Sequence, residues 1–285
     1  MDIGDRMKLY EGMETGRILM PSLPICIRLD GRAFHTFCKG LEKPFDKGFR
    51  DLMAEVTKAL VNECGAYAKI GYTQSDEISL VLWNDNPQQQ PYFGGRVQKI
   101  CSSLASLCSV TFNRLLPQYL PHFAEKGKVG MFDCRVWNVP TLAEAANVIL
   151  WREQDATKNS ISSAAQSMFS HKFLQGLDGK QMQELMFKSE GVNWNDYPAY
   201  FKRGTYVTRI TTDAPFTAAD IEALPPKHAA RTNPDLVVSR SVIAVKDFGY
   251  PLGSIANRVG VLFDGEDPII LKPTEPTTPS EVTPS

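Results

Sequence analysis

The sequence lacks the features that mark several classes of protein. No run approaches the ~20 consecutive apolar residues of a transmembrane helix, and the first residues, MDIGDRMKLYEG, are polar rather than a secretory signal. The six cysteines are scattered, without the CxxC pairs of a zinc site or the density of a disulfide scaffold. We therefore expect a cytoplasmic protein whose cysteines are reduced and mostly buried.

An excess of positive charge is also missing. The formal net charge is −1, which argues against nonspecific coating of nucleic acid, so an RNA partner would need a local basic patch. With 43% hydrophobic and 22% charged residues, the composition is that of a globular protein. There is no internal repeat, and the last residues, 272–285, lack large apolar side chains, which predicts a flexible tail.

Hydrophobic periodicity predicts an α/β order in the first half of the chain. The run PICIRLD is β-branched and ends at the turn dipeptide Asp30-Gly31. The predicted elements are strand 24–30, helix 46–65, strand 66–73, strand 77–83, helix 94–115 and strand 129–140. Strand, helix, strand, strand, helix, strand is the ferredoxin-like βαββαβ order with an antiparallel sheet.

Two carboxylates stand at special places in this order. Asp30 ends the first strand, and Asp76 lies in the short turn between the second and third strands. If the first and third strands are neighbours, these aspartates face each other. Carboxylate oxygens suit Mg²⁺, which shares its coordination with phosphates, and the backbone carbonyl of Gly31 is a plausible further ligand because glycine permits close approach. Alternation turns Glu77 away, so we do not count it as a ligand.

Cations surround the first carboxylate. Arg28 and Arg32 flank Asp30, and His35 and Lys43 follow within a few residues. Arginine matches phosphate oxygens with two parallel hydrogen bonds. A triphosphate-binding role competes here with ordinary surface charge and, for His35, with a structural histidine.

Several motifs in order then carry a resemblance: GDRMKLYE, IRLDGRAFH, EKPFDKGFRDLM, YTQSDEISLV, and FDCRVWNVP followed by WREQDATKNS. Over about residues 4–210 the chain resembles the histidine-tRNA guanylyltransferase family of 3′-5′ polymerases. The resemblance implies a polymerase-palm core, two Mg²⁺ ions and a homotetramer that adds nucleotides to the 5′ end of tRNA. ATP or GTP first activates the 5′-phosphate, and the 3′-hydroxyl of an incoming nucleotide then attacks it.

The resemblance also assigns residues. Asp30, Gly31 and Asp76 would hold the metals, and Asp30 and Asp76 would be catalytic. The nucleotide-binding positions would be Arg28, Arg32, Phe34, His35, Lys43, Ser75 and Asp76. Contacts to tRNA or triphosphate would come from Arg152, Asp155, Lys158, Asn159, His171, Lys172, Lys202 and Arg203, although for the helical residues the alternative is a surface ion-pair face.

One departure and one weak region limit the resemblance. Eukaryotic members carry His-Ile-Asn-Asn where this chain has Thr-Lys-Asn-Ser at 157–160. That difference favours template-dependent repair of truncated tRNA 5′ ends over selection of histidine tRNA. We expect a core over 1–140 and an extension over 141–271 that completes the site. Lys227, His228, Arg231 and Arg240 could add positive surface for RNA, though a solvated loop is the simpler interpretation.

Two alternatives remain from sequence. A nucleotidyl cyclase or cyclic-dinucleotide synthase would share the palm and its aspartates. A noncatalytic ferredoxin-like RNA-binding module would present sheet aromatics to bases, for which Tyr67 and Tyr72 are candidates.

Overall fold

The computed structural model describes residues 1–84, 86 and 88–271, so the predicted tail at 272–285 lies outside the described residues. Its strands are β1 (Ile25–Gly31), β2 (Ala68–Gln74), β3 (Glu77–Leu82), β4 (Phe132–Asn138), β5 (Thr205–Pro215) and β6 (Val237–Lys246). The α-helices are α1 (Ile3–Thr15), α2 (Phe34–Phe37), α3 (Lys47–Glu63), α4 (Val97–Tyr119), α5 (Pro121–Glu125), α6 (Leu142–Met168), α7 (His171–Leu174), α8 (Gly179–Glu190), α9 (Ala199–Arg203) and α10 (Ala218–Ala223).

The strands form one antiparallel sheet in the order β4-β1-β3-β2-β5-β6. The first four strands have the ferredoxin-like order, so the predicted fold class is confirmed. Because β1 lies beside β3, Asp30 pairs directly with Glu77 in the ladder. The end of the first strand therefore lies level with the β2–β3 turn, as the sequence predicts.

Helices cover both faces of the central strands. On one face, α3 and α4 bury alternate residues of β1 and β3, including Ile27, Leu29 and Leu80, in the largest apolar cluster. The long helix α6 and the segment around Leu252 cover the opposite face, where Cys26 is buried. Because successive side chains of a strand point to opposite faces, the sheet contributes to two apolar cores, one on each face. The functional site is therefore sought at the ends of the strands, between the two cores.

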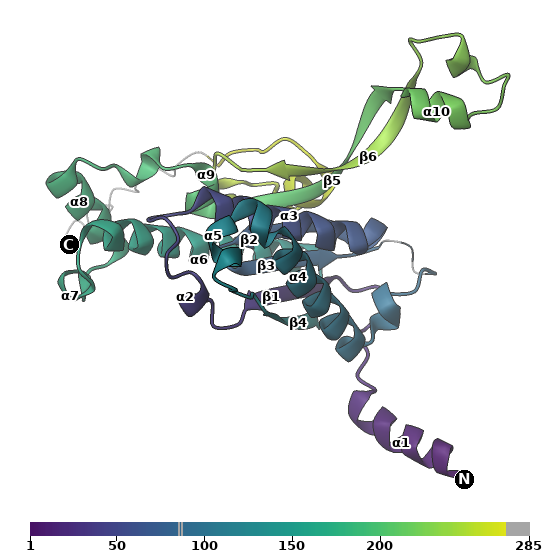
Figure 1. Ribbon diagram of the computed structural model, residues 1–285, viewed down its shortest axis with the longest axis horizontal. Coiled ribbons are helices and arrows are strands. Elements are labelled where there is room, and N and C mark those ends of the chain that lie inside the picture. Colours follow the sequence, from purple (N-terminus) through teal and green to yellow (C-terminus); the bar gives the residue numbers. More distant parts are fainter. Residues whose placement is uncertain (85, 87, 272–285) are drawn as a thin grey trace, which may run out of the picture.

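Two parts extend away from this body in Figure 1. The β5–β6 ribbon, green to yellow-green in the figure, projects beyond the sheet and carries α10 at its tip, residues 216–236; we call the ribbon and its tip the arm. Helix α1, in purple, buries none of its residues and projects from the body at the lower right of the view. A smaller apolar cluster joins α6 to α8 and Trp194.

The predicted boundaries differ from the structure at α4. The helix begins at Val97 rather than 94, because Phe93, Gly94 and Gly95 have φ angles of 51°, 63° and 70° that a right-handed helix excludes. Strand β5 continues the sheet of the first 140 residues through its ladder with β2. No helix within the described ranges is both long and apolar enough to cross a bilayer.

Candidate active site

The β2–β3 turn places Asp76 beside the end of β1. Gln74 pairs with Glu77, so only Ser75 and Asp76 form the turn, and Ser75 adopts a left-handed φ of 49°. The Gly31 amide donates a hydrogen bond of 3.1 Å to the Asp76 carbonyl. The Ser75 hydroxyl donates to a carboxylate oxygen of Asp76 at 3.0 Å. Backbone pairing therefore fixes the two predicted metal-binding segments against each other.

Gly31 is required by this close approach. A Cβ atom at this position would lie 2.4 Å from the Phe34 ring and 2.8 Å from the Asp76 carboxylate. Both distances are shorter than van der Waals contact, so any side chain would push the β1 end away from the turn. The glycine leaves the Gly31 backbone and the Asp76 carboxylate next to each other.

The electrostatics of the two aspartates are unfavourable without a cation. Burial raises the pKa of Asp76 above its ordinary value, and the charge of Asp30 raises it further, while hydrogen bonds from its own backbone and Ser75 act in the other direction. Asp30 has a side chain that is 37% exposed, and Arg135 on β4 approaches it only to 3.9 Å. Two carboxylates are thus held together with little positive charge to offset them.

This donor set fits a divalent metal. Within the described ranges, no cluster of three or more histidine, cysteine, aspartate or glutamate side chains forms a metal cage. Asp30, Asp76 and backbone carbonyl oxygens near Gly31 are hard oxygen donors. A hard cation that is completed by substrate phosphates needs only one or two protein carboxylates.

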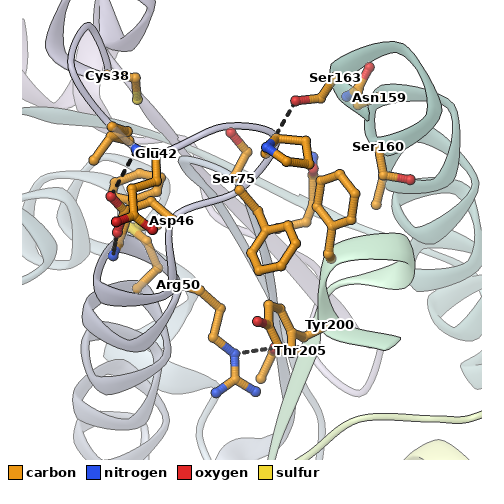
Figure 2. Close-up of a pocket in the computed structure, with 18 of the residues that line it drawn as sticks. Cys38, Glu42, Asp46, Arg50, Ser75, Asn159, Ser160, Ser163, Tyr200 and Thr205 are labelled. Atoms are coloured by element: carbon orange, nitrogen blue, oxygen red, sulfur yellow. Dashed lines mark hydrogen bonds between the residues drawn. The ribbon is translucent and has the colours of Figure 1, made fainter. Parts of the chain in front are cut away.

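A cavity of about 300 Å³ opens beside Ser75 (Figure 2). Its walls come from the 41–46 loop, the start of α3, the end of β2, α6 and α9. Phe45, Phe49 and Phe201 give it an apolar, aromatic lining, and Ser75, Asn159 and Ser163 supply polar groups at its edge. An apolar slot with a few polar groups is the usual form of a small-molecule site.

Hydrogen bonds hold the walls of this cavity in place. Asp46 caps α3 through Phe49 N at 2.9 Å and also accepts from Glu42 N at 3.1 Å. The Ser163 hydroxyl donates to the Pro44 carbonyl at 2.8 Å, which ties the loop to α6 (Figure 2). The loop is therefore fixed at both ends of the cavity.

Arg50 braces the opposite wall. Its Nε donates to the Thr205 hydroxyl at 3.2 Å, and its Nη2 donates to Asp247 at 3.0 Å. The guanidinium also lies 4.6 Å from the centre of the Tyr200 ring. A single α3 side chain therefore connects the cavity to β5, α9 and the segment after β6.

The predicted nucleotide-binding residues divide into exposed and buried groups. Arg32, His35 and Lys43 are exposed, and Lys43 lines the cavity. Arg28 is half-buried, and its guanidinium lies 5.7 Å from the Trp151 ring. Phe34 differs from the expectation: it is 3% exposed and packs on Phe37, Phe49, Phe112 and Phe132. Its ring therefore supports the Gly31 turn and is not available to a ligand.

The second predicted set also splits. Lys158, Asn159, His171 and Lys172 are exposed, and Arg203 is partly buried. Arg152 and Lys202 differ from the sequence expectation, because both are buried. Arg152 pairs with Glu77, with Asp155 as a second partner, and Lys202 donates to the Asn195 carbonyl. Their charged groups are occupied within the protein and do not face a ligand.

Sequence reasoning missed three contacts around the site. Glu77 is the partner of Arg152, Arg135 faces Asp30, and Arg50 braces the cavity. The position of Arg135 could have been predicted from strand alternation, because it pairs with Arg28 in the β1–β4 ladder and so lies on the same sheet face. The partners of Glu77 and Arg50 lie far along the chain, and no local pattern indicates such contacts.

The structure also bears on the RNA-binding alternative. Such a module needs aromatic rings on an open sheet face. Tyr72 is 1% exposed and donates its hydroxyl to the Arg203 carbonyl, and Tyr67 is partly buried against Tyr92. Neither ring is available for base stacking.

A four-stranded antiparallel core with a carboxylate at the end of its first strand and another in the adjoining turn is the palm-like arrangement shared by nucleotidyltransferases and nucleotidyl cyclases. Comparison with known proteins gives the family. The family model for tRNAHis guanylyltransferase matches residues 4–140. A solved bacterial tRNA(His) guanylyltransferase-like protein in complex with ATP is 41% identical, with a TM-score of 0.68 over 73% of this chain and 88% of that one. The chain therefore belongs to the tRNAHis guanylyltransferase family.

Further relatives are similar over most of their length. A bacterial guanylyltransferase-like protein in complex with GTP is 33% identical, with a TM-score of 0.63 over 85% of this chain and 90% of that one. The tRNA(His) guanylyltransferase of Saccharomyces cerevisiae is 28% identical over 69% of this chain and 86% of its own. An uncharacterised protein of Acanthamoeba polyphaga mimivirus is 31% identical over 74% of this chain and 79% of its own.

Proposed function

We propose that this protein adds nucleotides to the 5′ end of tRNA in the 3′-5′ direction. The observation that carries the proposal is the turn that fixes Asp76 against Gly31 and Asp30, next to a cavity that opens at Ser75. This geometry brings a triphosphate-binding centre and a nucleobase slot together. Relatives named for guanylyl transfer to tRNA, and others solved with ATP or GTP, support the same reaction.

The activating nucleotide, ATP or GTP, would place its base in the cavity and its phosphates over the carboxylates. The aromatic lining offers stacking surface for a purine, and the volume of about 300 Å³ lies at the lower end of the range of small-molecule sites. Lys43 lines the cavity, and Arg32 and His35 are exposed just after Asp30, so their charges would meet the phosphates.

The reaction then has two transfers. In the first, a 5′-phosphate oxygen of the tRNA attacks the α-phosphorus of ATP, and pyrophosphate leaves. In the second, the 3′-hydroxyl of an incoming nucleotide attacks the 5′-phosphorus of the activated end, loses its proton, and AMP leaves. Neither transfer needs a protein nucleophile, so the protein contributes position and charge.

Asp30, Asp76 and the Gly31 carbonyl would hold the metal, which we propose to be two Mg²⁺ ions. When bound, such ions lower the pKa of the attacking hydroxyl and neutralise charge on the leaving group. The protein holds the two carboxylates in fixed register, because Asp30 lies in a ladder and Asp76 accepts the Gly31 amide. Its part is preorganisation of these oxygens.

The tRNA end would meet cations of α6, α7 and α9. Lys158, His171 and Lys172 are exposed, Arg203 is half-buried, and Asn159, next to Lys158, lines the cavity. The Thr-Lys-Asn-Ser stretch at 157–160 supports template-dependent 5′-end repair rather than selection of histidine tRNA. By family resemblance we further propose a cytoplasmic homotetramer in which residues 141–271 complete the site formed by 1–140.

The test uses 5′-truncated, 5′-monophosphorylated tRNA with Mg²⁺, ATP and all the common nucleoside triphosphates. We expect the tRNA to gain the missing nucleotide opposite its template base, with the label of the incoming nucleotide at the 5′ end. A protein that is folded and binds ATP but extends no tRNA would contradict the proposal. A cyclic product formed from triphosphate alone would instead identify a cyclase.

A further inference from the structure

Arg152 and Glu77 form a two-pronged ion pair beneath the catalytic turn. Arg152 Nε lies 2.6 Å from Glu77 Oε1, and Arg152 Nη2 lies 2.8 Å from Glu77 Oε2. The side chains are only 8% and 9% exposed. Nη2 also reaches Asp155 at 2.9 Å, one turn along α6. This geometry pairs two guanidinium nitrogens with both carboxylate oxygens, and a lysine could not reproduce it.

The position of Glu77 connects this pair to both proposed metal-binding carboxylates. Glu77 follows Asp76 directly in the chain, and it is the ladder partner of Asp30. Its carbonyl accepts the Thr73 hydroxyl at 2.9 Å, which closes the turn from the β2 side. A displacement of Glu77 would therefore move Asp76 through the backbone and Asp30 through the ladder.

The other end of the pair is fixed to a long helix. Helix α6 is 27 residues long, and it packs its buried face on the sheet through Ala145, Ala146 and Ile149. Arg152 thus joins a rigid element to Glu77, the residue that follows the two-residue turn. A turn residue at positive φ, such as Ser75, is held in place only when its surroundings determine it.

We propose that Arg152 and Glu77 are a positioning pair, which sets the relative positions of the Asp30 and Asp76 carboxylates for metal binding. The inference rests on the proposed function. Stability alone is a poor reason for such a pair, because a buried ion pair contributes little more than apolar residues of the same volume. Its place under the turn gives it a geometric role, and side chains that orient metal ligands commonly change metal affinity about 10–100-fold when replaced.

The experiment measures Mn²⁺ binding to the folded protein by the electron paramagnetic resonance of free Mn²⁺, together with the melting temperature. The first variant is Arg152→Lys, which keeps the charge but loses the fork. The second is the double variant Arg152→Met with Glu77→Leu, which fills the space with apolar side chains. Glu153→Gln is the matched control, because Glu153 is the adjacent buried α6 residue and bonds to Tyr206 and Leu252 instead.

We expect Arg152→Lys to weaken Mn²⁺ binding at least about tenfold, while Glu153→Gln changes it less than twofold. We expect Arg152→Lys to lower the melting temperature relative to wild type. The double variant should regain much of that lost stability, but its Mn²⁺ binding should stay as weak as that of Arg152→Lys. In nucleotide addition at saturating triphosphate, Arg152→Lys lowers kcat more than it changes KM, because the attacking and leaving oxygens are misaligned.

Three results would overturn the inference. Mn²⁺ affinity unchanged in Arg152→Lys would make the pair a packing feature. So would a double variant that recovers Mn²⁺ binding along with its melting temperature. Wild-type protein that binds no Mn²⁺ would remove the metal site itself. If wild type binds Mn²⁺ but extends no tRNA, the proposed function fails, and the binding comparison still decides whether the pair positions the carboxylates.

Discussion

Arg152 and Glu153 are adjacent in α6, both are buried, and they hold different parts of the molecule. Arg152 pairs with Glu77 next to the β2–β3 turn, which we propose as the catalytic turn. Glu153 accepts the Tyr206 hydroxyl at 3.0 Å and the Leu252 amide at 2.9 Å, so it anchors β5 and the segment after β6. One residue supports the site, and the next supports the scaffold.

The two neighbourhoods differ in how their charges are satisfied. On the side of the proposed site, burial and then the charge of Asp30 raise the pKa of Asp76, and Arg135 approaches Asp30 only to 3.9 Å, as expected where a ligand supplies positive charge. On the scaffold side, hydrogen bonds within the chain satisfy Glu153. Substitutions should therefore separate into those that change activity and those that change stability.

The largest expected effect comes from Asp76→Asn. We expect nucleotide addition to fall by more than about a hundredfold, because a charged oxygen ligand is lost. The melting temperature should stay the same or rise, since a buried charge with a raised pKa is removed. Asp235→Asn, at an exposed position of the β5–β6 arm, is the control and should leave both unchanged. A parallel loss of stability and activity would contradict the separation.

A smaller effect is expected when the cavity is filled. Asn159→Trp introduces bulk from an exposed α6 position that lines the cavity, so the core should be unaffected. We expect KM for the activating nucleotide to rise about tenfold, equivalent to about 1.4 kcal/mol, with little change in melting temperature. Gln154→Trp, exposed on the same helix, is the control. Equal effects of both variants would show that the base does not enter the cavity.

The arm should respond as scaffold rather than as RNA-binding surface. Arg231 donates hydrogen bonds to the carbonyls of Pro225 and Glu222 at 3.1 Å each, so its guanidinium stabilises the backbone of the tip. Arg231→Ala should increase the rate of limited proteolysis at the tip several-fold and change tRNA affinity less than about twofold. Lys227→Ala, which removes the same charge from the tip, should leave proteolysis unchanged. A large fall in tRNA affinity for Arg231→Ala would place RNA on the arm.

The smallest effect concerns Glu153 and pH. Burial raises the pKa of Glu153 above its ordinary value of 4.5, although the Leu252 and Tyr206 hydrogen bonds oppose this. The folded protein therefore holds this proton more tightly than the unfolded chain does. Its contribution to stability is fully present below pH 4.5 and is lost as the pH rises through the folded pKa.

Glu153→Gln removes that titration and keeps an acceptor for Tyr206. We expect the melting temperature of the variant, relative to wild type, to increase as the pH is raised from below 4.5 towards neutrality. Parallel melting curves over the whole range would show that Glu153 does not titrate with folding. Activity at neutral pH should be unaffected, because Glu153 contacts no part of the site.

Much of the fold was predictable because its signals are local. Alternation and helical periodicity located β1, α3, β2 and β3, and the β1–β3 pairing that follows from their order placed Asp30 level with the turn. The boundary of α4 was misplaced because positive φ angles at Phe93 and the following glycines are a backbone property without a hydrophobic pattern.

The buried polar contacts were not predictable. In the sequence, Arg152 and Lys202 look like cations of a basic surface. In the structure, Arg152 is paired with Glu77, and Lys202 donates a hydrogen bond to the Asn195 carbonyl. Arg152 lies 75 positions from Glu77 in the sequence, and only the packing of α6 on the sheet brings the two together. The same holds for the cavity, whose walls come from four separate stretches of the chain, within 38–53, 73–75, 156–163 and 200–205.

The most direct test of the catalytic centre follows the first transfer alone. Wild type, Asp30→Asn and Asp76→Asn are each mixed in excess with 5′-monophosphorylated, truncated tRNA, Mg²⁺ and α-labelled ATP, and label on the tRNA is measured over a single turnover. We predict rapid labelling by wild type, and no labelling by either variant or by wild type in excess chelator. Labelling by Asp76→Asn at the wild-type rate would contradict the assignment of the β1 end and the β2–β3 turn as the catalytic centre.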